Sequence, residues 1–247
     1  MRAVLAGLFF GVLISSVALA EDRPTVLGAG VAVITSPYKG ADGRTMALPF
    51  LSCEYKGFYL LGIEAGYRFH DKDGIVLSVF GQPRFMGYHS SDSDALAGME
   101  DRRESFDLGL KAEYALPFST GWAVEGKIIQ DALSRYDGRE AAVMLRKVFT
   151  QEHFRLTLSG GVKGQSRQLT GYYYGVTAAE VRTDRPAYRP GAALNPTAGV
   201  VVMSGLSQDW PVVLRLGVDR LDTNIRKSPL AGRDYVLTAA LGVTRRF

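Results

Sequence analysis

The side chains that most often perform catalysis or bind metals are scarce in this chain of 247 residues. Its single cysteine, Cys53, and its three histidines, His70, His89 and His153, show no metal-ligand spacing. The only cluster of hydrolase type is His89 with Ser90, Ser91, Asp92 and Asp94. Adjacent residues on a polar loop do not show convergence on one reacting atom, so we interpret this cluster as a solvated loop. We therefore predict no enzyme activity, no metal and no cofactor.

A second group of reactive side chains consists of charged residues that alternate with apolar ones. They are Asp107, Lys111, Glu113, Glu125, Lys127, Asp131, Arg155, Lys163, Arg215 and Asp219. Charges of both signs are tolerated in the interior of a membrane barrel, where they are paired and hydrated, and are costly on its lipid face. The interpretation we favour is a structural plug of ion pairs across a lumen, and the alternative is a narrow polar pore.

The elements that must position these charges have a period of two residues. Apolar residues alternate with polar or small ones through 105–116, 154–163 and 212–219. The candidate strands run to about ten to twelve residues, as a tilted membrane strand requires (~9–11), whereas strands of globular proteins average about five or six. We predict an all-β fold, an antiparallel transmembrane β-barrel formed by residues 21–247.

The number of strands is constrained by parity. The candidate strands are 25–34, 46–55, 58–69, 75–86, 105–116, 121–132, 139–150, 153–164, 194–203, 211–221 and 234–247. A bacterial single-chain barrel has an even number of strands, so these eleven contain one error. Either one segment before residue 87 does not cross the membrane or 58–69 is split, which predicts ten or twelve strands.

The connections between the candidate strands fall into two classes by length. The short links 117–121, 150–153 and 204–210 are expected in the periplasm. The long links 87–104, 164–193 and 222–233 are expected outside the cell.

The two ends of the chain indicate export and membrane assembly. Residues 1–20 combine Arg2, an apolar run over 3–14 and a small-residue ending at Ala20, which is the pattern of a cleavable signal peptide. The last strand alternates to a terminal Phe247, typical of the assembly signal of outer-membrane barrels. The net charge of +4 is spread along the chain and gives no nucleic-acid footprint. We expect location in the outer membrane, with its lipid as one partner.

The connection 165–193 carries Tyr172, Tyr173, Tyr174 and Tyr188. Long loops without regular structure are usually functional or disordered, and three consecutive tyrosines argue against disorder. Tyrosine is common at interaction sites and also packs well within ordered loops. We favour packing of this loop over or into the barrel mouth, with partner binding as the alternative.

The same stretch resembles the MipA/OmpV family of outer-membrane proteins. The specific part is Tyr172–Val176 with Pro186–Gly191, and supporting matches are Ser36–Gly40, Arg220–Asp222, Ser228–Leu230 and the closing strand to Phe247. The ending Arg245-Arg246-Phe247 departs from the family's Tyr-Arg/Lys-Phe pattern.

The resemblance carries over no catalytic residues. It implies a scaffold that holds a lytic murein transglycosylase and a bifunctional penicillin-binding protein together. Other family members resemble surface adhesins or small porins. The leading hypothesis is therefore a non-enzymatic scaffold of murein remodelling, and the alternatives are a small porin or receptor for polar solutes and a surface adhesin.

Overall fold

A computed structural model describes residues 25–152, 154–205 and 210–247. The expected signal peptide, residues 1–20, lies outside the described residues, so its cleavage stays a prediction. None of the helices among the described residues is long and apolar enough to cross a membrane.

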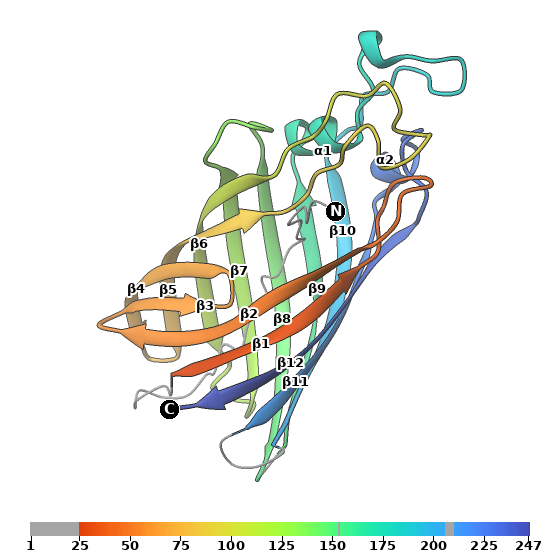
Figure 1. Cartoon of the computed structure of the whole chain (residues 1–247). Coiled ribbons are helices and arrows are strands. Elements are labelled where there is room, and N and C mark those ends of the chain that lie inside the picture. The colour runs from red at the N-terminus through yellow and green to blue at the C-terminus, as the bar shows by residue number, and fades with distance from the viewer. Residues whose placement is uncertain (1–24, 153, 206–209) are drawn as a thin grey trace.

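The described chain forms one closed antiparallel barrel (Figure 1). Its strands are β1 (Val26–Ile34), β2 (Arg44–Tyr55), β3 (Phe58–Leu61), β4 (Glu64–Lys72), β5 (Ile75–Arg84), β6 (Ser105–Ala115), β7 (Trp122–Asp131), β8 (Arg139–Gln151), β9 (Phe154–Gln165), β10 (Ala193–Gly205), β11 (Pro211–Arg220) and β12 (Tyr235–Arg246). Each strand pairs with the next along the chain, and β1 closes the barrel on β12. The predicted fold class is confirmed, with twelve strands.

The parity error lies in the candidate strand 58–69, which is split. β3 ends at Leu61, Gly62 adopts a positive φ of 62°, and β4 begins at Glu64. Because Gly lacks a Cβ atom, it adopts this conformation at low cost. β3 is consequently the shortest strand of the barrel wall, with four residues.

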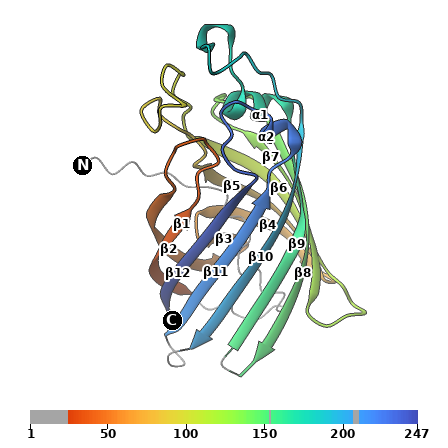
Figure 2. The same cartoon turned by 90° about the vertical axis from the view of Figure 1, so that its right-hand side faces the viewer.

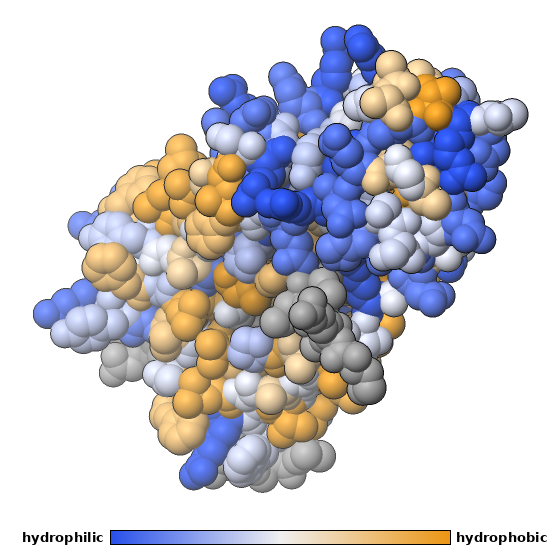
Figure 3. Space-filling view, turned by 45° about the horizontal axis from the view of Figure 1, so that its top comes forward, coloured by the Kyte–Doolittle hydropathy of each residue, from blue (hydrophilic) through white to orange (hydrophobic). Residues whose placement is uncertain are grey.

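Side chains alternate between lipid and lumen along the strands, as the period of two predicts. On β6, for example, Leu108 and Leu110 are exposed, whereas Asp107, Lys111 and Glu113 are buried. Figure 3 shows apolar side chains gathered over the barrel and hydrophilic ones over the loop end. This distribution is typical of a membrane barrel, whose outer surface carries an apolar band.

The two ends of the barrel differ in the length of their connections (Figures 1 and 2). One end has tight turns, including Lys56-Gly57 and Asp73-Gly74 with positive φ at both positions, the geometry of a two-residue type I′ hairpin. The other end carries helix α1 (Arg167–Tyr174), the 3₁₀ turn η1 (Ala178–Glu180) and helix α2 (Thr223–Arg226). Short turns face the periplasm in such barrels, so we assign the helical end to the outside.

The largest apolar cluster lies at this outer end, where loops pack on one another and on the strand ends. We call the loops 35–43, 85–104, 132–138, 166–192 and 221–234 the cap. The cluster's aromatic members are Tyr38, Tyr88, Tyr136, Tyr173 and Tyr174, all at most 6% exposed. The cap therefore provides the barrel with a core of its own above the lumen.

Candidate functional site

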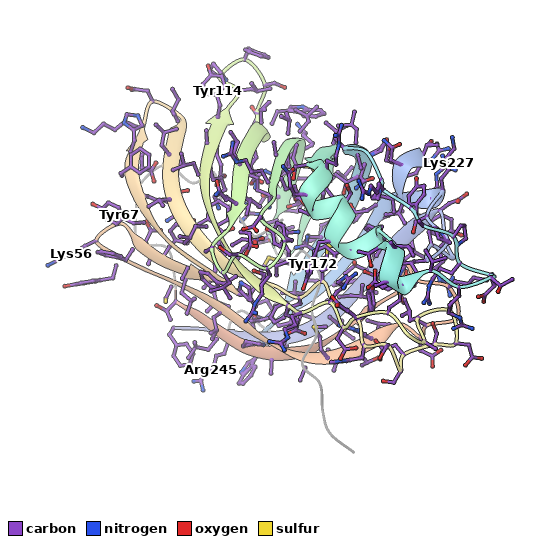
Figure 4. All side chains as sticks on the ribbon, turned by 90° about the horizontal axis from the view of Figure 1, so that it is seen from above. Lys56, Tyr67, Tyr114, Tyr172, Lys227 and Arg245 are labelled. Carbon is purple, nitrogen blue, oxygen red and sulfur yellow. The ribbon has the colours of Figure 1, made fainter. Side chains whose placement is uncertain are left out.

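Helix α1 lies across the barrel mouth, as the view from above shows (Figure 4). Ser166 precedes the helix, and its hydroxyl accepts a hydrogen bond from the N–H of Leu169 at 3.4 Å. Serine is favoured at this position because it satisfies a backbone donor that lacks a partner in the helix. The sequence pattern predicts an irregular loop here, and the signal for the helix that this prediction overlooks is the N-cap residue Ser166.

Tyr173 and Tyr174 form the buried face of α1. The centroid of the Tyr173 ring lies 5.9 Å from that of Tyr136, and the centroid of the Tyr174 ring lies 5.6 Å from that of Tyr38. Burial raises the pKa of both hydroxyls, Tyr173 and Tyr174, well above the ordinary value. Both side chains are therefore neutral at physiological pH and act as packing groups.

Tyr172 and Tyr188 are half-buried and join α1 to other loops. The Tyr172 hydroxyl accepts a hydrogen bond from the N–H of Arg103 at 3.0 Å, and the Tyr172 carbonyl accepts one from Nε of Arg102 at 2.8 Å. The Tyr188 hydroxyl donates to the carbonyl of Asn224 at 2.8 Å. The structure therefore brings the four predicted tyrosines together in the cap, each in contact with its own chain.

An ion pair between Arg102 and Glu180 fastens two cap loops together. Their Nη2 and Oε1 atoms are 2.7 Å apart, and both side chains are at least nine-tenths buried. Although burial raises the pKa of Glu180, hydrogen bonds from the backbones of Thr177 and Glu100 and the charge of Arg102 lower it below the ordinary value. Glu180 is thus a carboxylate when the cap is closed.

A buried ion-pair network crosses the outer part of the lumen below the cap. Arg84 contacts Asp107 at 2.7 Å and Glu140 at 3.5 Å, with all three side chains fully buried. The Tyr136 hydroxyl donates to Asp107 at 2.5 Å. Arg84 and Glu140 were not among the residues predicted for the lumen, although both alternate in phase with their strands.

A second network contains the predicted lumen residues Lys111, Glu113 and Glu125. Glu113 lies directly opposite Glu125 in the β6–β7 register, an arrangement that is unfavourable without a counter-charge. Arg146 supplies that charge at 2.7 Å from Glu113 and 3.6 Å from Glu125. Glu64 of β4 contacts Lys111 at 2.5 Å. Arg146 alternates in phase with the inward residues of β8 and was missed there, and Glu64 was missed because the turn at Gly62 reverses the phase of the candidate strand 58–69.

Four further predicted lumen charges line a small cavity of about 40 Å³, whereas Asp131 accepts hydrogen bonds from the Ser105 hydroxyl and the N–H of Tyr136. Lys127, Lys163 and Arg215 line it together with the carboxylate of Asp219, and the Lys163 ammonium lies 2.7 Å from Asp219. The remaining lining consists of small or neutral side chains: Ala142, Met144, Ser159, Thr197, Ala198, Gly199, Gly217, Val218 and Thr238. A space of this size holds a few water molecules or a small ion.

Two predicted residues lie near the periplasmic rim, apart from these groups. Arg155 is half-buried on β9, opposite Met203 of β10. The N–H of Phe247 donates to the carbonyl of Thr25 at 2.9 Å, and its ring is 66% exposed. The ring lies 5.1 Å from the guanidinium of Arg245. The role of Phe247 in assembly stays a prediction.

The loop cluster at His89 forms a small hydrogen-bonded unit. Its Nδ1 lies 2.8 Å from Oδ2 of Asp101, and both side chains are about half exposed to solvent. The hydrogen bond from His89 lowers the pKa of Asp101. Among the residues that the structure describes, no three His, Cys, Asp or Glu side chains gather as a metal site.

Comparison with known proteins places the chain in a family. The family model described as MltA-interacting protein MipA matches residues 27–247. The MltA-interacting protein of Escherichia coli K12 is 25% identical over 246 residues, 97% of this chain and 98% of that protein. Outer membrane protein OmpV of Vibrio cholerae is 25% identical over 166 residues, 66% of this chain and 63% of that protein. A solved outer membrane channel of Pseudomonas putida F1 covers 92% of this chain and 97% of its own at 13% identity, with a TM-score of 0.47.

The family match and the barrel agree with one another. The matched residues include every strand from β2 to β12 and nearly all of β1. Relatives over most of the chain are named outer membrane proteins, and an antiparallel barrel with an apolar outer band is the architecture of that membrane. The chain is an outer-membrane β-barrel and belongs to the MltA-interacting protein MipA family.

Proposed function

We propose that this barrel is a non-enzymatic scaffold for murein-remodelling enzymes. Its partners would be a lytic transglycosylase and a penicillin-binding protein, held at the inner surface of the outer membrane. The observation that carries the proposal is the similarity over 97% of the chain to a protein named for its interaction with MltA.

The closed interior supports a scaffold over a passage for solutes. The cap packs tyrosines across the outer mouth, and ion pairs bridge β4, β6, β7 and β8 below it. Removing either partner of a buried ion pair is strongly unfavourable, so the bridges hold the wall together. A barrel of this kind presents a rigid periplasmic rim on which other proteins can assemble.

The periplasmic rim carries a strongly exposed aromatic side chain on the turn between β6 and β7. The turn between β6 and β7 carries Phe118, which is 82% exposed. Exposed aromatic side chains are frequent anchors of protein interfaces. We assign Phe118 as a contact for the transglycosylase.

Capture of a purified lytic transglycosylase by the immobilised barrel tests this proposal. Phe118→Ser should weaken capture about tenfold, equivalent to about 1.4 kcal/mol. The matched control is Tyr235→Ser, which removes an exposed aromatic side chain at the opposite end of the barrel and should leave capture unchanged. Failure of the wild-type barrel to capture either a transglycosylase or a penicillin-binding protein would refute the scaffold.

A second candidate function, a narrow channel or receptor for small polar solutes, is favoured by the cavity at Lys127, Lys163 and Arg215. These three cations face one carboxylate, Asp219. Such a lining attracts anions and rejects cations in a hydrated pore. Single-channel current separates this function from the scaffold.

A further inference from the structure

The barrel wall is incomplete along one side of β2. This strand pairs with β1 from Arg44 to Ser52, but with β3 only from Ser52 to Tyr55. In the described part of the chain, no strand pairs with the other edge of β2 between Arg44 and Leu51. Figure 1 shows β2 continuing past the short β3 toward the loop end.

The facing edge of β5 is unpaired at the same end. The β4–β5 ladder ends at the pair Ala65 and Gly81, whereas β5 continues to Arg84 and stays paired with β6. Below the gap, the N–H of Gly62 donates to the carbonyl of Leu51 at 2.6 Å. Above it, Arg44 donates to the carbonyl of Gly87 at 2.8 Å. These bonds bound a window between β2 and β5, above the β3–β4 turn.

Each edge of this window carries a proline. The Leu51 carbonyl points to the β3 side of β2, and backbone groups alternate in direction along a strand, so the nitrogen of Pro49 points into the window. On β5, the backbone groups of Ile75 point toward β4, because Ile75 pairs with Lys72 across the hairpin turn. Pro83 lies an even number of residues further along, so its nitrogen points to the same side and therefore into the window. Proline has no N–H, and within sheets it is found at such edges.

The window lies at the level of the apolar band. Val31, the β1 partner of Ala47, is 50% exposed, and Phe106, the β6 partner of Pro83, is 39% exposed. A backbone donor without a partner is strongly unfavourable in hydrocarbon, so open edges are avoided there. The two prolines each remove one donor at the place where no strand can satisfy it.

The lumen behind the window is apolar on the β2 side. Its inward side chains there are Met46, Leu48 and Phe50, in contrast to the charges of β6–β8. The Phe50 ring leans away from the open edge onto Gly30 and Gly242, where an added Cβ would lie 2.6 and 2.4 Å from the ring. These glycines make room for the ring beside β1 and β12.

A cavity of about 40 Å³ borders the upper corner of the window, since Arg44 and Gly87 belong to its lining. Its apolar lining residues are Ile34, Pro37, Tyr38, Ala41, Phe85 and Met86, and its polar ones are Thr35, Ser36, Asp42, Arg44 and Asp92. The lining residues come from 34–44, which lead into β2, and from 85–92, which follow β5. The apolar side chains of β2 are thus followed by apolar side chains of the cavity, beside the ion pair of Arg44 and Asp92.

We propose that the gap between β2 and β5 is a lateral opening that admits the acyl chain of a membrane lipid. A hydrocarbon chain needs no hydrogen bond from the edges and matches the apolar lining. A β-strand of another protein is a poorer occupant, because Pro49 and Pro83 offer it no N–H donor. The lipid chain would lie against Leu48 and reach toward Met86.

Photo-crosslinking in vesicles of phosphatidylethanolamine and phosphatidylglycerol tests the opening. Benzoylphenylalanine is placed at Leu48, and in a second variant at Phe50, with lipid adducts detected by mass spectrometry. Met144 is the matched control, because it also faces the lumen but sits behind a wall paired on both sides. Leu110, which is 60% exposed on the lipid face, is the positive control.

Lipid adducts at Leu48 or Phe50 comparable to those at Leu110, with background at Met144, are the expected result. Each variant is first checked for altered gel mobility on boiling, which reports a folded barrel. The proposal is overturned if both folded variants, at Leu48 and at Phe50, give only intramolecular products or crosslinks to a second protein chain. Equal lipid adducts at Met144 also overturn it, because the lipid would then enter by another route.

Discussion

The lumen wall formed by β4–β8 and the wall formed by β9–β12 enclose the same space with different side chains. The first wall is crossed by Arg84–Asp107, Lys111–Glu64 and Arg146–Glu113 contacts of 2.5 to 2.7 Å. The second wall carries mostly Gly, Ala, Ser and Thr side chains where it borders the cavity at Lys163 and Arg215.

The first wall is therefore expected to be rigid, and the second wall to leave space in the lumen. In the first wall, the buried charges are stabilised by one another instead of by water. Each charge is therefore costly if its partner is removed. Small side chains leave room for water at the second wall, where charges keep part of their hydration. We expect substitutions in the first wall to affect stability and those in the second to affect what the lumen accepts.

The largest effect is expected for Arg84→Ala in the first wall. This change leaves the buried carboxylates Asp107 and Glu140 without their shared cation, at a cost of about 3–5 kcal/mol. The temperature at which the heat-modified gel band appears should fall markedly, whereas Arg220→Ala, an exposed arginine at the end of β11, should leave it unchanged. Equal temperatures for Arg84→Ala and wild type would show that the ion pairs are not structural.

The next effect concerns the cap, which packs above both walls. Replacing Tyr172, Tyr173 and Tyr174 by Ser removes buried rings and should destabilise the cap by about 3 kcal/mol. Thermal stability should fall more than transglycosylase capture does, and Tyr55→Ser, a 70% exposed residue at the other end, is the control. An unchanged melting temperature with lost capture would instead identify the tyrosines as a partner site.

A smaller effect is expected for Arg215→Ala in the second wall and for Lys127→Ala, which lies on β7 of the first wall but lines the same cavity. Water in the cavity can solvate the groups that lose the Lys127 or Arg215 side chain as a partner. Each substitution should therefore lower the free energy of unfolding by about 1 kcal/mol. The gel transition should shift less than it does for Arg84→Ala. A shift for Arg215→Ala as large as that of Arg84→Ala would remove the distinction between the two walls.

The smallest effect is a loosening of the cap in acid. The pKa of Glu180 is lowered in the folded chain, so its stabilisation is complete above its ordinary value of 4.5 and is lost as the pH falls through the lower, folded value. Hydrogen exchange of residues 166–192 should therefore quicken, relative to intrinsic rates, below about pH 4. Glu180→Gln should remove this pH dependence, and its persistence in that variant would exclude Glu180 as the cause.

The sequence predicts the barrel well because successive side chains of each strand face lipid and lumen in turn, which leaves an alternation of apolar and polar residues. The split of 58–69 was also detectable. Tyr59 and Leu61, at odd positions, face inward before the turn, whereas Glu64, at an even position, faces inward after it. A single unbroken strand could not place both sets on one face. The partners of the lumen charges were not predictable. The Lys111–Glu64 contact depends on the stagger of β4 to β6, and alternation along one strand carries no information about that stagger.

Single-channel recording in planar bilayers tests the closed-lumen account most directly. The account predicts no discrete current steps for the wild-type barrel, with its band on unboiled gels confirming that it is folded. It predicts the same silence for Lys127→Ala and Arg215→Ala. Clear wild-type conductance, with a reversal potential that shifts toward cation selectivity in these two variants, would contradict the scaffold with a plugged lumen and establish a pore.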